Sequence, residues 1–184
     1  MEPFLVSLTL VALAEMGDKT QLLSLVLAAR YRRPWPIVLG ILVATLLNHA
    51  IAGALGSWLT ATLGAQTLRV IVGVGFLAMA AWALVPDKLD GAPVAKAGLG
   101  VFAATCVAFF IAEMGDKTQV ATVALAARYA SFAPVVLGTT IGMLLANVPV
   151  VFLGERLAAR LPMRLLQRIA AALFAVLGIW ALVA

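Results

Sequence analysis

One seven-residue sequence, EMGDKTQ, occurs twice in this chain, at residues 15–21 and 113–119. Both copies lie within apolar stretches long enough to cross a bilayer, which takes about 20 mostly apolar residues. A charged side chain near the bilayer centre costs about 2.5–3.5 kcal/mol on insertion scales, so intramembrane acids usually face a partner or a cavity. The motif therefore restricts the fold to one that shields four carboxylates and two ammonium groups.

The composition indicates a polytopic membrane protein. Of the 184 residues, 64% are hydrophobic and 11% are charged, and the mean hydropathy is +1.10, which excludes an ordinary soluble domain. The net charge of +5 does not indicate a nucleic-acid partner, because the arginines fall in short segments between apolar runs. The single cysteine, Cys106, excludes an intrachain disulfide.

The hydropathy pattern predicts an all-α membrane protein with six transmembrane helices. The predicted spans cover residues 4–29, 37–59, 68–85, 98–127, 135–154 and 165–184. No basic segment precedes the first apolar run, so we expect that run to be a true span and not a cleaved signal peptide. The first and fourth spans are long and are interrupted by the motif.

The two halves of the sequence repeat with a constant offset of 98 residues. Between 15–31 and 113–129, twelve of seventeen positions are identical, and the same offset pairs Phe76 with Phe174 and Trp82 with Trp180. We therefore expect a first three-helix repeat at 1–85, a central cytoplasmic loop at 86–97 and a second three-helix repeat at 98–184. Three spans per repeat force the second copy to enter the membrane from the opposite side, so the repeats are predicted to be inverted.

The distribution of basic residues predicts the orientation. One side collects Arg30, Arg32, Arg33, Lys88, Lys96, Arg156, Arg160, Arg164 and Arg168, whereas the other has only Arg69 and Arg128. Because cytoplasmic loops carry the excess of Lys and Arg, both termini are expected outside the cytoplasm.

The motif residues predict a cation site. In a continuous helix, Glu15, Asp18 and Lys19 would share one face. If the two motifs meet, they bring together the acids Glu15, Asp18, Glu113 and Asp116, with Thr20, Gln21, Thr118, Gln119, Asn48 and Asn147 as supporting polar or ligand candidates. Such oxygen ligands suit Ca²⁺, Mg²⁺ or Mn²⁺.

Other motif residues have structural alternatives. Lys19 and Lys117 are predicted counter-charges for the acids when no metal is bound. A purely structural Glu–Lys pair would leave one acid per motif uncompensated, so we favour an ion site. His49 is a candidate proton relay, although polar residues in membrane helices often only bond across helices. Gly17 and Gly115 either pack helices closely or open the span locally.

At these residues the chain resembles the GDT family of the cation/Ca²⁺ exchanger superfamily, whose members carry two copies of E-x-G-D-K/R-T/S. The resemblance covers the whole chain. It implies a divalent cation/proton exchanger, since Golgi and thylakoid members move Mn²⁺ and Ca²⁺ and bacterial members export Mn²⁺. It also implies that Glu15, Asp18, Glu113 and Asp116 bind the ion. The short central loop and the lack of an N-terminal extension favour a bacterial plasma membrane.

We therefore expect a secondary transporter that exports Mn²⁺ in exchange for protons and has no enzymatic activity or cofactor. Ca²⁺ is the alternative cargo, because oxygen ligands do not separate the two ions. A passive cation channel lined by the same acids is an alternative from another class. An intramembrane enzyme is disfavoured because catalysis rarely needs two equivalent acid–lysine sets. The sequence leaves open whether the chain forms a homo-oligomer.

Overall fold

The computed structural model describes residues 1–85, 100–154 and 163–183, and every regular element in these ranges is a helix. The predicted all-helical class is confirmed. The helices of the first half are α1 (Glu2–Glu15), α2 (Lys19–Tyr31), α3 (Pro34–Thr62) and α4 (Ala65–Ala83). Those of the second half are α5 (Val101–Glu113), α6 (Lys117–Tyr129), α7 (Phe132–Leu153) and α9 (Met163–Val183).

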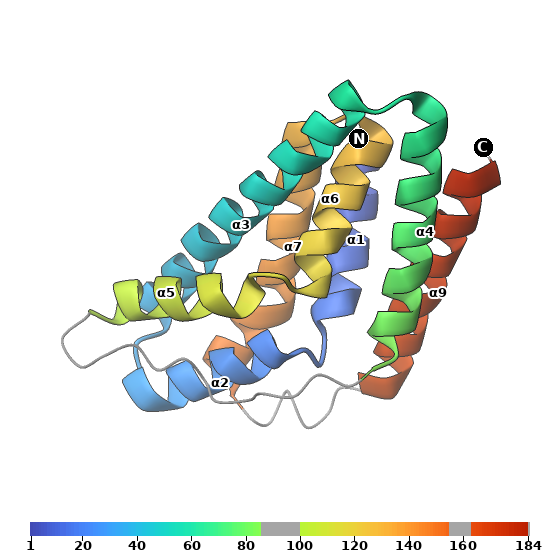
Figure 1. The fold of residues 1–184 in the computed structure, drawn as a ribbon. Helices are drawn as coiled ribbons and strands as arrows, with labels where there is room; N and C mark the ends of the chain where they lie inside the picture. Colours follow the sequence, from blue (N-terminus) through green and yellow to red (C-terminus); the bar gives the residue numbers. More distant parts are fainter. Residues whose placement is uncertain (86–99, 155–162, 184) are drawn as a thin grey trace.

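Four of these helices are long and apolar enough to cross a membrane: α3, α4, α7 and α9, the last counted from Arg164. At 1.5 Å per residue, the 29 residues of α3 extend about 43 Å, more than the roughly 30 Å of a hydrocarbon core. This length requires α3 to tilt, and Figure 1 shows it inclined to its neighbours.

The first and fourth predicted spans are not continuous helices. Each is divided at the motif into two short helices of 13 or 14 residues, α1 and α2 in one half and α5 and α6 in the other. At about 20 Å each, none of these four helices can cross a bilayer alone. The expectation that Glu15, Asp18 and Lys19 share one helix face is therefore wrong, because a helix ends at Glu15 and the next begins at Lys19.

The helices pack around two apolar clusters. One joins α1, α4, α6 and α9 and includes Phe76 and Phe174, and the other joins α2, α3, α5 and α7 and includes Phe109. Figure 1 shows α4 and α9 side by side at one edge of the molecule, with α1 and α6 beside them. The motif breaks lie between the two clusters, where the short helices meet.

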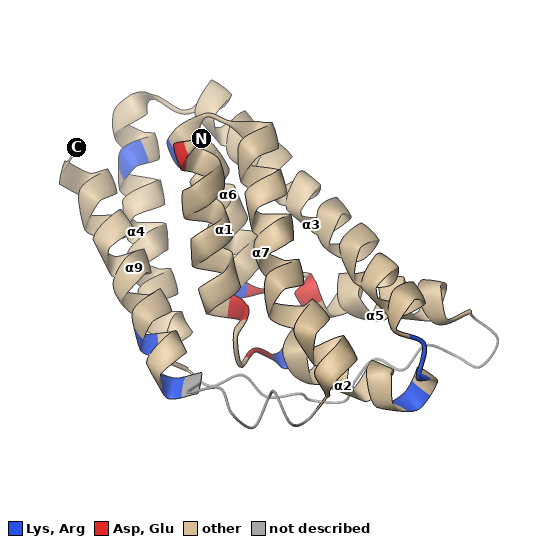
Figure 2. Cartoon of the chain, turned by 180° about the vertical axis from the view of Figure 1, so that it is seen from behind, with Lys and Arg blue, Asp and Glu red and all other residues tan. Residues whose placement is uncertain are grey.

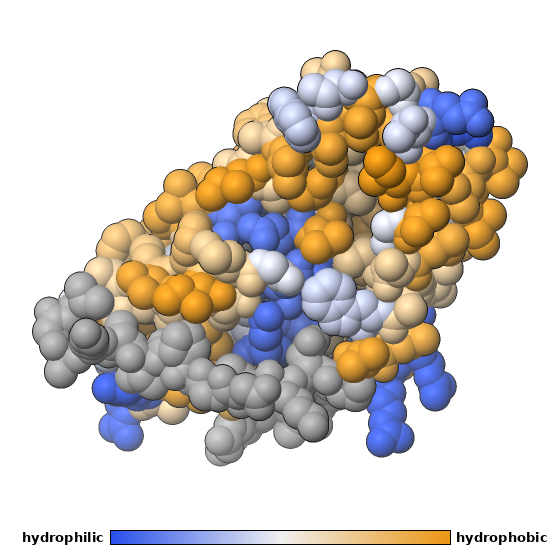
Figure 3. All heavy atoms as spheres, in the orientation of Figure 1, coloured by the Kyte–Doolittle hydropathy of each residue, from blue (hydrophilic) through white to orange (hydrophobic). Residues whose placement is uncertain are grey.

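The outer surface suits a lipid environment. Large apolar side chains such as Leu47, Ile51 and Val176 are more than half exposed, and Figure 3 shows orange, hydrophobic atoms over much of one face. Exposed apolar area on this scale marks a membrane or protein interface. The predicted central loop 86–97 lies outside the described residues.

Candidate functional site

The motif glycines end the first helix of each pair. Gly17 has φ of 88° and Gly115 has φ of 75°, values that residues with a Cβ rarely adopt. After the turn, Asp18 and Asp116 stand at the N-caps of α2 and α6 in extended conformation. Aspartate is a favoured N-cap residue, so the Gly-Asp pair accounts for a helix break in the middle of an apolar stretch.

The motif glutamines hold these turns closed. The Oε1 atom of Gln21 accepts a hydrogen bond of 3.0 Å from the Gly17 N–H, and that of Gln119 accepts one of 2.8 Å from the Gly115 N–H. Their side-chain NH₂ groups donate to neighbouring helices. That of Gln21 donates to the Ala146 carbonyl in α7, and that of Gln119 donates to Asn48 Oδ1 in α3. Both glutamines, predicted as ligand candidates, thus cap helices in this structure.

Three carboxylates meet at the junction of the two motifs. One carboxylate oxygen from each of Glu15, Glu113 and Asp116 lies within 4.8 Å of the others. Glu15 and Glu113 are 0% exposed and Asp116 is 1% exposed. Each of the three also has one buried oxygen with no hydrogen-bond partner among the described residues. Unsatisfied buried acceptors are costly, so this group is suited to a cationic ligand.

The motif lysines pair crosswise. The Nζ atom of Lys19 lies 2.7 Å from Asp116 Oδ1, and that of Lys117 lies 2.5 Å from Asp18 Oδ1. Each lysine therefore forms an ion pair with an aspartate of the other motif. The side chain of Lys19 is 24% exposed whereas that of Lys117 is 3% exposed, so the two pairs differ in their access to solvent. Figure 2 shows red and blue segments gathered in the interior of the molecule, where α1, α2 and α5 end or begin, and further charged residues near the ends of the helical body.

The motif threonines orient the glutamates. Thr20 Oγ1 donates to Glu15 Oε2 at 2.7 Å, and Thr118 Oγ1 donates to Glu113 Oε2 at 3.0 Å. Bonds from a hydroxyl to a carboxylate are about twice as strong as neutral ones. Because each threonine uses its proton on one glutamate oxygen, the other oxygen of each glutamate is left for a ligand.

The predicted polar residues of α3 and α7 lie in different surroundings. Asn48 accepts from Gln119 and donates to the Phe110 carbonyl, which links it to the second motif. Asn147 instead accepts from Ser24 Oγ at 2.8 Å and donates to Met143. His49 is buried with Nδ1 3.5 Å from Thr140 Oγ1. Its role as a proton relay stays a prediction.

The carboxylate group matches the size of a divalent cation. Two oxygens bound to one ion at about 2.4 Å can be no more than roughly 4.8 Å apart, and one oxygen from each of Glu15, Glu113 and Asp116 lies within that limit of the other two. The oxygen donors favour Mg²⁺, Ca²⁺ or Mn²⁺. Hydrophilic atoms also interrupt the hydrophobic surface near the middle of the face in Figure 3.

Comparison with known proteins assigns the family. The family model described as "Divalent cation/proton antiporter GDT1" matches residues 3–91 and 101–184. The chain belongs to this GDT1 family. The resemblance drawn from the motifs is thereby confirmed, and the protein is a divalent cation transporter in the membrane. The two matched segments coincide closely with the two halves of the sequence repeat.

Two curated GDT1 relatives are similar over nearly their whole length. A "Putative manganese exporter" of Vibrio cholerae serotype O1 is 50% identical over 180 residues, which cover 97% of this chain and 90% of that protein. The "GDT1-like protein sll0615" of Synechocystis sp. is 28% identical over 203 residues, covering 98% of each chain. No solved structure matches the chain.

The sequence left two features of this region open: the helix break, which was one of two alternatives for the motif glycines, and the partners of the motif lysines. The helix break was signalled by Gly17 followed by an N-cap residue, Asp18, which marks a helix start. The crosswise lysine pairing had no sequence signal, because spacing within one motif favours Lys19 beside its own acids.

Proposed function

We propose that this transporter exports Mn²⁺ from the cytoplasm in exchange for protons, at a site formed by the two EMGDKTQ motifs. The observation that carries the proposal is the group of three buried carboxylates, Glu15, Glu113 and Asp116. Mn²⁺ is chosen over Ca²⁺ because the Vibrio cholerae relative is described as a manganese exporter. The flux experiment described below compares Mn²⁺ and Ca²⁺ as cargo.

Proton exchange is supported by the chemistry of the ligands. A carboxylate must be deprotonated to bind a metal ion, so binding an ion and binding protons exclude each other at the same oxygens. Asp18 is proposed to complete the site. Its carboxylate contacts Lys117 in the present structure, and a cation bound at Glu15, Glu113 and Asp116 would repel both lysines and release the aspartates as ligands.

The architecture is proposed to consist of six membrane crossings in two inverted repeats, 1–85 and 98–184, joined by a cytoplasmic segment at 86–97. Two of the crossings are the broken helices α1–α2 and α5–α6. Discontinuous helices that meet at the centre of inverted repeats are a recurrent way of building transporter sites. The reciprocal pairs Lys19–Asp116 and Lys117–Asp18 support a local two-fold relation between the motifs.

The proposed orientation places both termini outside the cytoplasm. Figure 2 shows basic residues gathered at the end of the molecule where α2 ends and α9 begins. The described cations there are Arg30, Arg32, Arg33, Arg164 and Arg168. Lys88, Lys96, Arg156 and Arg160 lie outside the described residues. Positive charge on this scale marks the cytoplasmic side.

The test is flux through the purified protein in liposomes, with Mn²⁺, Ca²⁺ and Mg²⁺ offered separately and internal pH recorded. We expect Mn²⁺ movement to drive protons in the opposite direction and an imposed pH gradient to drive Mn²⁺ uphill. Ca²⁺ transport with little Mn²⁺ transport would reassign the cargo. Downhill cation flux that ignores the pH gradient would overturn the exchanger and identify a channel.

A further inference from the structure

The helices α4 and α9 pack against only one part of the molecule. α9 packs on α1 and α4 packs on α6, as Figure 1 shows. In the part of the chain that the structure describes, neither helix packs to a comparable extent on α2 or α5. The other six helices follow the sequence repeat, because α7 packs on α1 and α2 while α3 packs on α5 and α6. The α4–α9 pair departs from this pattern, because it packs on only one of two equivalent sets of short helices.

A contact between a cationic and an aromatic side chain joins α6 to α9. The guanidinium carbon of Arg128, in the last turn of α6, lies 4.3 Å from the ring centroid of Trp180 in α9. This distance is well within the roughly 6 Å reach of a cation–π interaction. On the same side, Tyr129 donates to Glu2 Oε1 at 3.4 Å and so links the end of α6 to the start of α1.

The sequence repeat places the same pair of residue types on the other side of the molecule. Arg30 occupies the position of Arg128, and Trp82 that of Trp180, each 98 residues earlier. Here the pair is not formed. The Arg30 guanidinium instead lies 5.5 Å from the ring of its neighbour Tyr31.

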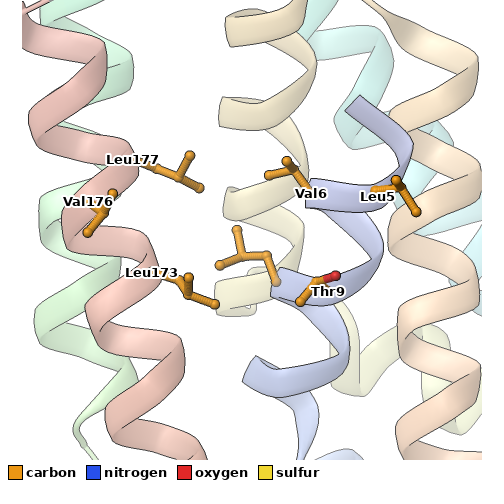
Figure 4. A pocket seen from close by; sticks show the side chains of 7 residues that line it. Leu5, Val6, Thr9, Leu173, Val176 and Leu177 are labelled. Carbon is orange, nitrogen blue, oxygen red and sulfur yellow. The ribbon is translucent and has the colours of Figure 1, made fainter. Parts of the chain in front are cut away.

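The interface between α9 and α1 is of a kind that allows the two helices to separate. A groove of about 320 Å³ lies between these helices, and Figure 4 shows apolar side chains of α1, such as Val6, opposite Leu173 and Leu177 of α9. Thr9 is the only polar residue of its lining. An interface held by apolar contacts and a groove can part without breaking a buried hydrogen bond.

The contact between α4 and α9 is tighter. The position of a Cβ at Gly73 would lie 2.5 Å from Leu182 Cγ, and that of a Cβ at Gly178 would lie 2.9 Å from the Gly73 carbonyl oxygen. Phe76 and Phe174 also meet across this pair. Backbones in such close approach favour movement of α4 and α9 together as one body.

From these contacts we propose that Arg128–Trp180 and Arg30–Trp82 are two alternative latches, of which only one is closed at a time. The structure has the first latch closed and the second open. In the other state the α4–α9 body leaves α1 and α6, covers α2 and α5, and closes Arg30 on Trp82. This inference rests on the proposed exchange function, for which it supplies the two gates.

The experiment measures two spin-label distances in liposomes, in a Cys106→Ala background. One label pair is at Arg33 and Val85, beside the open latch, and the repeat-equivalent pair is at Ser131 and Val183, beside the closed one. For the parent protein we expect a long 33–85 distance and a short 131–183 distance to predominate.

Variants of each latch should move the two distances in opposite directions. Arg128→Gln and Trp180→Leu should lengthen the 131–183 distance and shorten the 33–85 distance. Arg30→Gln loses no contact to another helix in the described structure. Compared with the parent, it should reduce the fraction of molecules in which the 33–85 distance is short.

Each variant should also slow exchange several-fold, whereas Trp180→Phe, which keeps a ring face, should retain part of the rate. Arg32→Gln, an exposed cation near Arg30, is the matched control and should change neither distances nor rate.

Two results would overturn the latches: distances that do not respond to Arg128→Gln or Trp180→Leu, or two distances that lengthen together, as in general loosening. The readout is independent of the proposed function. Distances that respond as expected in a protein without proton-coupled flux would retain the latches and reject the exchanger. Normal exchange with distances that do not respond would reject the latches and retain the exchanger.

Discussion

Phe76 and Phe174, which occupy equivalent positions in the two halves of the sequence, contact each other with ring centroids 6.3 Å apart. If a local two-fold axis relates the halves, as proposed, a contact between equivalent residues places the axis nearby. The crosswise pairs Lys19–Asp116 and Lys117–Asp18 provide a second such point at the motifs. Both contacts are reciprocal, which makes paired substitutions at equivalent positions informative controls for each other.

Neutralising either site glutamate should abolish transport. Glu15→Gln and Glu113→Gln keep the side-chain shape but remove one of the buried anionic ligands, so the Mn²⁺ dissociation constant should rise at least tenfold, or about 1.4 kcal/mol. Binding and flux of the purified variants in liposomes are the measurements. Glu2→Gln, at the exposed start of α1, is the control and should behave as the parent. Normal transport by both site variants would reject the shared carboxylate site.

Acidification should weaken Mn²⁺ binding, because protons and metal compete for the same oxygens. If one proton leaves per ion bound, the dissociation constant rises tenfold per pH unit in the range where that acid is protonated, and if two leave it rises 100-fold. Asp18→Asn and Asp116→Asn should weaken both the binding and its pH dependence. Calorimetric titration in two buffers of different ionisation enthalpy counts the protons directly. A dissociation constant independent of pH would remove the basis for exchange.

The two motif lysines should contribute unequally to stability. Breaking a buried ion pair costs about 3–5 kcal/mol, because the partner charge is left uncompensated, whereas solvent moderates this cost for an accessible pair. Lys117 is 3% exposed and Lys19 is 24% exposed. Lys117→Met should therefore lower the thermal midpoint in detergent more than Lys19→Met does. Equal losses would mean that solvent access does not distinguish the pairs.

Lys19→Met has a further expected effect on transport. Metal binding should persist, because the ligands remain, but the metal-free, protonated carrier should return slowly, because without the Lys19 charge two protons no longer neutralise the site. Exchange of labelled Mn²⁺ for unlabelled Mn²⁺, which does not need the metal-free carrier to return, should be less impaired than net flux. An equal impairment of both would place Lys19 in ion binding itself.

The helix break depends on glycine. At Gly115, a Cβ would meet nothing within 4 Å but would have to adopt φ of 75°, which costs a residue such as alanine about 1–2 kcal/mol. Gly115→Ala should therefore reduce stability and transport, and Gly115→Asn should do so less, because asparagine tolerates this conformation. Gly75→Ala, in open space within α4, is the control. A Gly115→Ala variant as stable as the parent would show that the turn can be formed without positive φ.

Orientation can be tested by labelling in intact cells. In a Cys106→Ala background, a cysteine at Arg32, where α2 ends, should resist an impermeant thiol reagent, whereas one at Thr62, the last residue of α3, should react. Permeabilised cells provide the control that both positions are reactive. Labelling at Arg32 from outside would reverse the proposed export direction.

The sequence was sufficient to predict the helical class and the meeting of acids from both motifs, because burying charge in an apolar chain leaves few arrangements. It left the helix breaks as one of two alternatives for Gly17 and Gly115, since the apolar pattern continues on both sides of Gly17. The one-sided packing of α4 and α9 could not be predicted at all. A repeated sequence has no feature that says which of two equivalent partners a helix will contact.

The two motif lysines also determine the net charge of the site in each state of the proposed transport cycle. Four ionised acids and two ammonium groups give the site a charge of −2, and either one Mn²⁺ or two protons bring that charge to zero. Both loaded forms would then cross the bilayer as neutral bodies, so one Mn²⁺ would exchange for two protons at a rate insensitive to the membrane potential. The empty site would carry two uncompensated charges through hydrocarbon, where each is costly. In such a cycle this cost would restrict the transporter to strict exchange, without a leak of either ion.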